Sequence, residues 1–193
     1  MSAKIASYVS DMGILPAFLE LSSAVPSSEI KLVEEAQLRD LKVITGGVTD
    51  VSWAMQARGH MLYVRGERDS IWGHHKVMLG YVKGHGFQFW AVIEAQGRED
   101  QLNNFGLVEI VVNGEEIKID ISERCQRATF GIYVNVISEI TQAEAKLIAY
   151  SDSFGVQVRF STEADMFLGI SAMSTDGGKE TLETFYNALC TDD

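Results

Sequence analysis

Residues 106–121 read Gly-Leu-Val-Glu-Ile-Val-Val-Asn-Gly-Glu-Glu-Ile-Lys-Ile-Asp-Ile, and this stretch decides which kind of sheet the chain forms. Two runs of alternating apolar and polar residues flank the dipeptide Asn113-Gly114. That dipeptide suits the positive φ angles of a type I′ turn, which joins antiparallel strands. The stretch therefore predicts a β-hairpin with one apolar face.

A two-residue turn at this dipeptide also predicts the register of the hairpin. Ile110 falls opposite Ile117 on the apolar face, and Glu109 falls opposite Lys118 on the other face. Helices that pack on one side of the sheet leave the face with Glu109, Val111 and Lys118 open. We expect strands of the first half or a second copy of the chain to cover it, so a homodimer is one predicted outcome.

After the hairpin, the sequence predicts a strand, a helix, two more strands and a last helix. The helix begins with the capping box Thr-Gln-Ala-Glu at Thr141, in which Glu144 is the third helical residue. A helical stripe continues to Phe154, and Gly155 is expected to end the helix. The other expected elements are strands over 130–137, 156–160 and 166–172 and a final helix carrying Leu182, Phe185, Tyr186 and Leu189.

Before the hairpin, the sequence predicts helices followed by a β-meander. Apolar residues recur at helical spacing over 5–12, Pro16 begins a second apolar piece, and Ser28 opens a helix that extends to about Leu41. From there the pattern alternates, with glycine turns between the runs. The polar segment 97–104 fits either a loop or one helical turn.

These elements predict an α+β protein: an antiparallel sheet meander with N- and C-terminal helices and one helix between strands near 141–154. The length of 193 residues is close to that of one domain. We expect a single globular unit over 1–193. Two sub-halves could build it: 1–100, with helices and the meander, and 101–193, with the hairpin, a strand, a helix, two strands and a helix.

The order of elements in the second half resembles the type III secretion chaperone-like fold, which the bacterial sensory-transduction-regulator family shares. The matching segments are 108–121, 128–137, 141–154, 156–160, 167–173 and 180–189. The resemblance implies an acidic, cytosolic and often dimeric protein without enzymatic activity. It also implies a function in holding other polypeptides.

The charge of the chain restricts its partners. The sequence has 27 acidic and 16 basic side chains, which gives a net charge of −11. This charge disfavours a nucleic acid or an anionic membrane as the partner and favours a basic protein.

The chain has no apolar run near the roughly 20 residues of a membrane span and no signal-peptide pattern at its start, and Cys125 and Cys190 form no C-x-x-C pair. We therefore expect a cytoplasmic protein.

No catalytic, cofactor or metal site is predicted. Four histidines lie in the β-rich middle, with two carboxylates that could complete a site: His60, His74, His75 and His85, with Glu67 or Asp69. Their spacing fits no metal-ligand rule, so structural roles are expected. Gly178-Lys179 resembles part of a phosphate loop, but Met173 and Glu180 occupy positions where that motif needs Gly and Ser or Thr.

The aromatic residues of the middle offer a different kind of site. In residues 86–90, alternation puts Phe87 and Phe89 on one face of a strand and Gln88 and Trp90 on the other. We expect most of these rings to pack in the core. A partner-binding patch around an exposed ring is the alternative.

The predicted function is that of a non-enzymatic, cytoplasmic protein-binding module: a chaperone, adaptor or inhibitor of another protein. One alternative is a small metal-dependent hydrolase that uses the region of His60, His74, His75 and His85, and a bound metal would favour it. The other is an acidic inhibitor that mimics nucleic acid. Carboxylates spaced like phosphates along one face would favour that alternative.

Overall fold

The structure, a computed structural model, describes residues 9, 14–26, 31–34, 37–38, 41, 43, 50–70 and 72–190. Its contacts divide the chain into two units, 1–47 and 48–193. The boundary therefore lies near residue 47. The sub-halves 1–100 and 101–193 are not separate, because β4 (Gly86–Glu94) of the first pairs with β8 (Tyr133–Glu139) of the second.

In the first unit, helix α2 (Ala17–Ser23) begins directly after Pro16, whose fixed φ suits a helix start. Of the helix expected over 5–12, only Val9 is described, and it is helical. The helix expected from Ser28 is wrong over 31–34, which are not helical, while 37–38 are. Ser28 itself lies outside the described residues.

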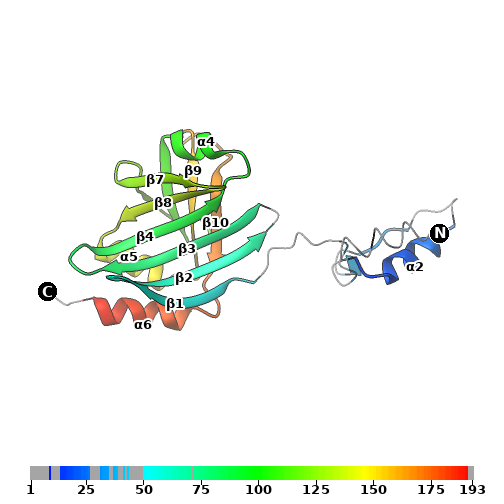
Figure 1. Ribbon diagram of the computed structural model, residues 1–193, viewed down its shortest axis with the longest axis horizontal. Helices are drawn as coiled ribbons and strands as arrows, with labels where there is room; N and C mark the ends of the chain where they lie inside the picture. The colour runs from blue at the N-terminus through cyan, green and yellow to red at the C-terminus, as the bar shows by residue number, and fades with distance from the viewer. Residues whose placement is uncertain are drawn as a thin grey trace. The chain divides into compact units, whose positions relative to one another are not determined.

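The second unit contains two antiparallel sheets (Figure 1). Sheet A has the order β1-β2-β3-β4-β8-β7, and its remaining strands are β1 (Ser52–Arg58), β2 (Met61–Ser70), β3 (Gly73–Val82) and β7 (Cys125–Phe130). Sheet B has the order β10-β9-β5-β6, with β5 (Leu107–Val112), β6 (Ile117–Asp120), β9 (Ser153–Arg159) and β10 (Leu168–Ser174). The helices are α4 (Glu99–Asn104), α5 (Gln142–Ala149) and α6 (Lys179–Leu189). This arrangement confirms the predicted α+β class with helices towards both ends. Helix α5 is the predicted helix between strands, and α4 is a second one, in the polar segment that fitted either a loop or one helical turn.

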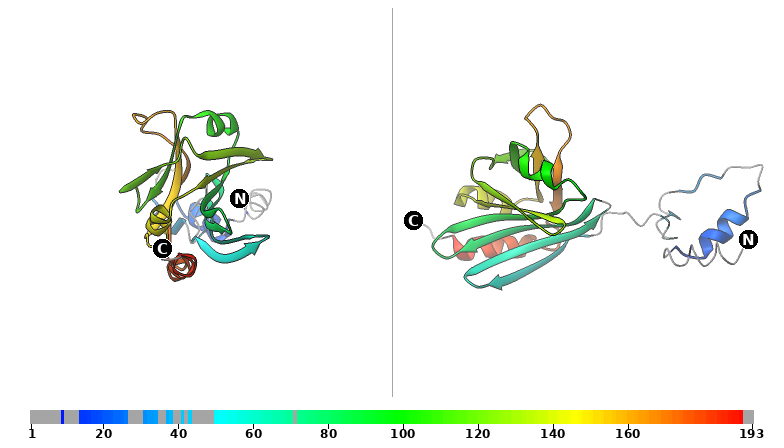
Figure 2. Two further views of the ribbon diagram at one scale, coloured as in Figure 1. Left: turned by 90° about the vertical axis from the view of Figure 1, so that its left-hand side faces the viewer. Right: turned by 45° about the horizontal axis from the view of Figure 1, so that its top comes forward.

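The core lies between the two sheets. One cluster of buried side chains contains inward residues of both sheets, such as Leu79 and Phe89 of sheet A and Ile110 and Val156 of sheet B. These four side chains have no exposed surface. Helices α5 and α6 close the same side of sheet A (Figure 2). The ring of Phe87 in β4, for example, lies 5.5 Å from the ring of Tyr186 in α6.

The hairpin at Asn113-Gly114 exists, but the predicted register is wrong by two residues. Ile110 pairs with Ile119, and Glu109 pairs with Asp120. Both turn residues have positive φ angles, 53° and 78°, yet Glu115 and Glu116 also belong to the loop. A shift of two residues keeps every side chain on its predicted face, so the apolar face is as expected.

Contacts with Asp152 and with Ser153, the first residue of β9, hold this wider loop. The side-chain oxygen of Asn113 accepts a hydrogen bond from the backbone N–H of Asp152 at 2.8 Å. The backbone N–H of Gly114 donates to the hydroxyl of Ser153 at 3.0 Å. The turn is therefore shaped by its neighbour in sheet B as well as by its own sequence.

The predicted end of the helix after Thr141 is also wrong. The capping box is present as predicted, but α5 ends at Ala149, and Phe154 and Gly155 belong to β9. The hydroxyl of Ser151 donates to the carbonyl of Ile148 at 2.8 Å and occupies one of the carbonyls left free at the helix end. Strand β7 was not predicted. Its six residues are mostly exposed and lack the alternation that indicates a strand.

On the face of sheet B that carries Glu109, Val111 and Lys118, only Lys118 of these three residues is exposed. Val111 has no exposed surface and Glu109 is 9 % exposed. Glu109 forms an ion pair with Arg159, whose guanidinium also donates to the carbonyls of the loop after β9. This correction removes the reason for which a second copy of the chain was expected on that face.

The indole ring of Trp53 in β1 packs against Gly66 of β2 and Gly178 at the start of α6. The sequence did not indicate this packing. A Cβ atom at Gly66 or Gly178 would lie 2.6 Å or 2.2 Å from the indole ring. The indole N–H donates to the carbonyl of Ser174 at 3.2 Å. Gly178 therefore has a packing role at the start of α6, and the neighbouring Lys179 pairs with Asp152.

Candidate functional site: the open face of sheet A

One face of sheet A points away from the core. Pairing across the strands places Arg65, Met78, Trp90, Ile137 and Gln126 in one row on this face. The described helices of the second unit contribute side chains to the core on the opposite side. No described element of residues 48–193 covers this surface, which we call the open face (Figure 1).

The open face has an apolar centre. Met78 lies directly opposite Trp90, and Trp90 lies directly opposite Ile137. Val92 is the next outward residue of β4 after Trp90. Met78 is 7 % exposed, while the other three side chains are half-buried. A half-buried indole at the centre of an uncovered sheet leaves apolar surface in water.

Polar side chains surround this centre. On one side, Glu67 lies 3.2 Å from the Nε of Arg65 and 3.5 Å from the Nζ of Lys76. Further polar residues of the rim are Gln88, Gln126, Asn135 and Glu139. The surface thus combines an apolar centre with a charged and polar rim.

A hollow of about 710 Å³ interrupts the rim where the β3–β4 turn meets the start of α5. Nine residues line it: His85, Gln88, Arg124, Gln126, Ile137, Ser138, Glu139, Ile140 and Thr141. Ile137 belongs both to this lining and to the apolar centre. The hollow is therefore continuous with the open face.

Arg124 at the hollow is held by the cap of α5. It donates to both carboxylate oxygens of Glu144, at 3.0 Å and 2.6 Å, which is the bidentate geometry that suits a guanidinium. Burial acts to raise the pKa of Glu144, but hydrogen bonds from Arg124 and Thr141 outweigh it and lower that pKa. The hydrogen bonds to Glu144 raise the pKa of Arg124. The charge of Arg124 is thus already balanced.

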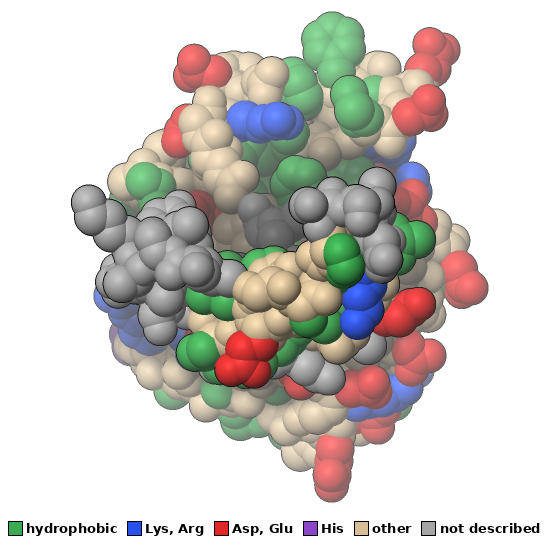
Figure 3. Space-filling view, turned by 90° about the vertical axis from the view of Figure 1, so that its right-hand side faces the viewer, with side chains coloured by type: hydrophobic (Ala, Val, Ile, Leu, Met, Phe, Trp, Pro, Cys, Tyr) green, Lys and Arg blue, Asp and Glu red, His purple; other side chains and the backbone are tan. Residues whose placement is uncertain are grey.

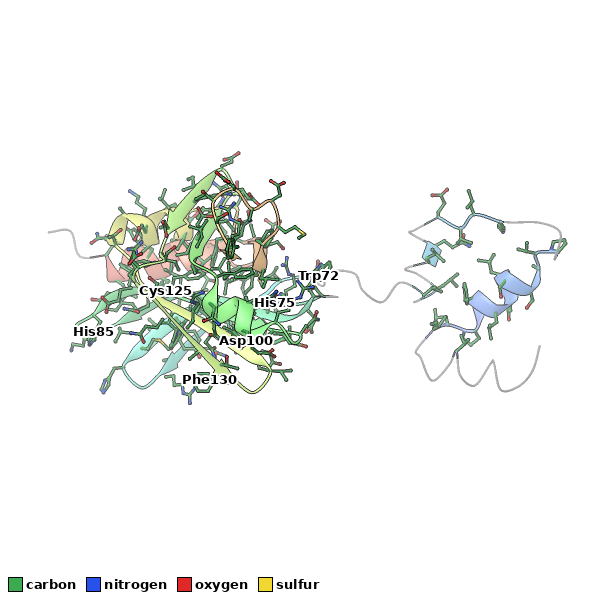
Figure 4. All side chains as sticks on the ribbon, turned by 90° about the horizontal axis from the view of Figure 1, so that it is seen from above. Trp72, His75, His85, Asp100, Cys125 and Phe130 are labelled. Carbon is green, nitrogen blue, oxygen red and sulfur yellow. The ribbon has the colours of Figure 1, made fainter. Side chains whose placement is uncertain are left out.

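The structure separates the four histidines. His60 lies in the β1–β2 turn and His85 in the β3–β4 turn, whereas His74 and His75 begin β3 at the opposite end of sheet A. Figure 4 labels His85 and His75 at these two ends. A ten-residue strand spans about 30 Å, so His60 and His85 cannot bind the same metal ion as His74 and His75. Among the described residues, no group of three His, Cys, Asp or Glu side chains could hold a metal ion.

His75 is buried in the core, and His74 is a partner of two carboxylates. The ring of His74 lies 2.7 Å from Asp69, and its backbone N–H donates to Glu94 at 2.9 Å. His75 is 3 % exposed and pairs across the strands with Arg68. Burial, together with the positive charge of Arg68, lowers the pKa of His75 to about 4 and outweighs the opposite effect of Glu94.

Of the two cysteines, Cys125 lacks the setting of a reactive thiol. Both are free and half-buried. Burial raises the pKa of the Cys125 thiol, which disfavours the nucleophilic thiolate form. The Cys190 sulfur lies 3.4 Å from the Tyr186 hydroxyl oxygen.

Comparison with protein-family models, with curated proteins and with solved structures found no match. The resemblance to the type III secretion chaperone-like fold therefore stays a prediction. Among the described residues, no helix combines the length and apolar character needed to cross a membrane.

Proposed function

We propose that the chain is a non-enzymatic protein-binding module and that the open face of sheet A is its binding surface. The observation that carries this proposal is the half-buried Trp90 between Met78 and Ile137, inside a polar rim. Binding energy in protein interfaces concentrates in central aromatic side chains, and the polar groups around them exclude water. The open face has this organisation.

A cytoplasmic location is part of this proposal, supported by the two free cysteines, since thiols stay reduced in that compartment. The net charge of −11 supports a basic protein partner. A role as chaperone, adaptor or inhibitor is compatible with such a surface. The buried Glu109 and Val111 of sheet B give a homodimer no support.

The two alternative functions lack an observation of this kind. The hydrolase would need histidines that converge, whereas these lie at opposite ends of sheet A. The nucleic-acid mimic would need carboxylates arranged in a line. On the face shown in Figure 3, acidic side chains are spread among other types.

Two substitutions test the proposal in the full-length chain. Trp90→Ser removes the central ring, and Ala128→Lys adds charge and bulk at an exposed, outward position of β7 opposite Asn135. We expect each to weaken binding of the natural partner about tenfold or more, because each disrupts the centre or the rim. The partner is first captured from an extract of cells that make the protein, and its affinity is then measured by calorimetry.

Ala188→Lys is the matched control, since it adds the same charge at an exposed position of α6. It should leave the affinity unchanged. Ala128→Lys keeps the test valid if Trp90→Ser proves unstable. A partner that binds both open-face variants as tightly as the wild type would overturn the proposal.

A further inference from the structure

The hollow beside the open face contains one carboxylate that pairs with no described lysine or arginine side chain. The side chain of Glu139 is 70 % exposed, and its nearest described basic group is His85 at 3.8 Å, beyond hydrogen-bond distance. Arg124, the only other charged residue in the lining, is already paired with Glu144. When Arg124 is counted together with its partner Glu144, and His85 as neutral, the carboxylate of Glu139 is the excess charge at the hollow.

Two amide side chains complete the polar part of the lining. Gln88 pairs directly with Glu139 across β4 and β8, and Gln126 pairs with Ile137 across β7 and β8. Neither amide hydrogen-bonds to another described side chain. Their carbonyl oxygens, like the carboxylate, are acceptors for the N–H groups of a cation.

From this geometry, we propose that the hollow binds a basic side chain, arginine or lysine, of the protein partner. The inference rests on the proposed function and adds to it the chemical class of one side chain of the partner. A partner segment that inserts a cation next to Glu139 also contacts Ile137, which lines the hollow and lies directly opposite Trp90 on the neighbouring strand. We thus expect a basic residue in the partner close to an apolar one.

The hollow can be tested without the partner. Full-length, ¹⁵N-labelled protein is titrated with N-acetylargininamide, N-acetyllysinamide and N-acetylcitrullinamide, of which the last has the shape of the first without its charge. We expect the amide signals of Gln88, Gln126 and Glu139 to shift with the two cations. We expect the citrulline probe to bind at least about fivefold more weakly than the arginine probe. Equal shifts with citrulline, or shifts elsewhere only, would overturn the inference.

Glu139→Gln tests the carboxylate itself, and we expect it to weaken binding of the arginine probe about fivefold. Glu116→Gln, at an exposed position of the β5–β6 loop, is the matched control and should have no effect. Unchanged binding by Glu139→Gln would contradict the inference. The proposed function fails separately, if Trp90→Ser and Ala128→Lys leave partner binding intact.

Discussion

Replacing Gly155 by alanine is expected to lower the free energy of unfolding by about 3 kcal/mol, because the site has no space for a methyl group. A Cβ atom there would lie 2.3 Å from the carbonyl oxygen of Ile170 and 2.9 Å from the backbone nitrogen of Ala172. These are main-chain atoms of β10, where the pairing with β9 is irregular between Ile170 and Met173. They cannot rotate away as a side chain could.

Urea unfolding followed by fluorescence measures this effect. Gly106→Ala is the control, because the nearest atom to its Cβ would be 4.0 Å away and its φ angle is not positive. We expect the control to change the stability by less than about 1 kcal/mol. Equal stabilities of the two variants would show that β10 does not lie against Gly155 as described.

Acid is expected to destabilise the protein through His75 in a defined range of pH. The pKa of His75 is lowered from 6.5 to about 4 in the folded chain, so below pH 6.5 the unfolded chain takes up a proton that the folded chain excludes. The free energy of unfolding therefore falls as the pH drops from about 6.5 to about 4. At about 1.4 kcal/mol per pH unit, the total is about 3 kcal/mol.

Denaturant unfolding at several pH values tests this prediction. His75→Gln removes the titrating group, and its stability should vary much less between pH 6.5 and 4 than that of the wild type. His60→Gln, at an exposed turn position, should keep the wild-type dependence. If the stability of His75→Gln has the same pH dependence as that of the wild type, the account of His75 is wrong.

Local signals in the sequence predicted local structure well. The capping box at Thr141, the stripe of the last helix and the alternation around Trp90 are all present, since each depends on neighbours in the chain. The register of the hairpin differs from the predicted one because residues 152 and 153, about forty positions away, form hydrogen bonds with the turn. Phe154 continued a helical stripe in the sequence, but it packs between the sheets as part of β9.

The candidate site could be predicted only in part. Alternation indicated that the side chain of Trp90 lies on the face of β4 opposite to that of Phe87 and Phe89. For this reason the Trp90 ring lies on the open face. The hollow could not be predicted, because the pairing of β4 with β8 brings Gln88 next to Glu139 from about fifty residues away. No pattern of composition or spacing contains that contact.

Oxidative footprinting of the complex tests the central claim, binding through the open face, most directly. Hydroxyl radicals modify methionine and aromatic side chains that water reaches, so protection reports where the partner lies. Bound to its captured partner, the protein should show several-fold slower oxidation of Trp90 and of Met61, which lies on the open face at the start of β2, on the same side of that strand as Arg65. Oxidation of Met166, which is 86 % exposed in the β9–β10 loop, should be unchanged. Oxidation of Trp90 and Met61 at the same rate in the free and the bound protein would contradict the account.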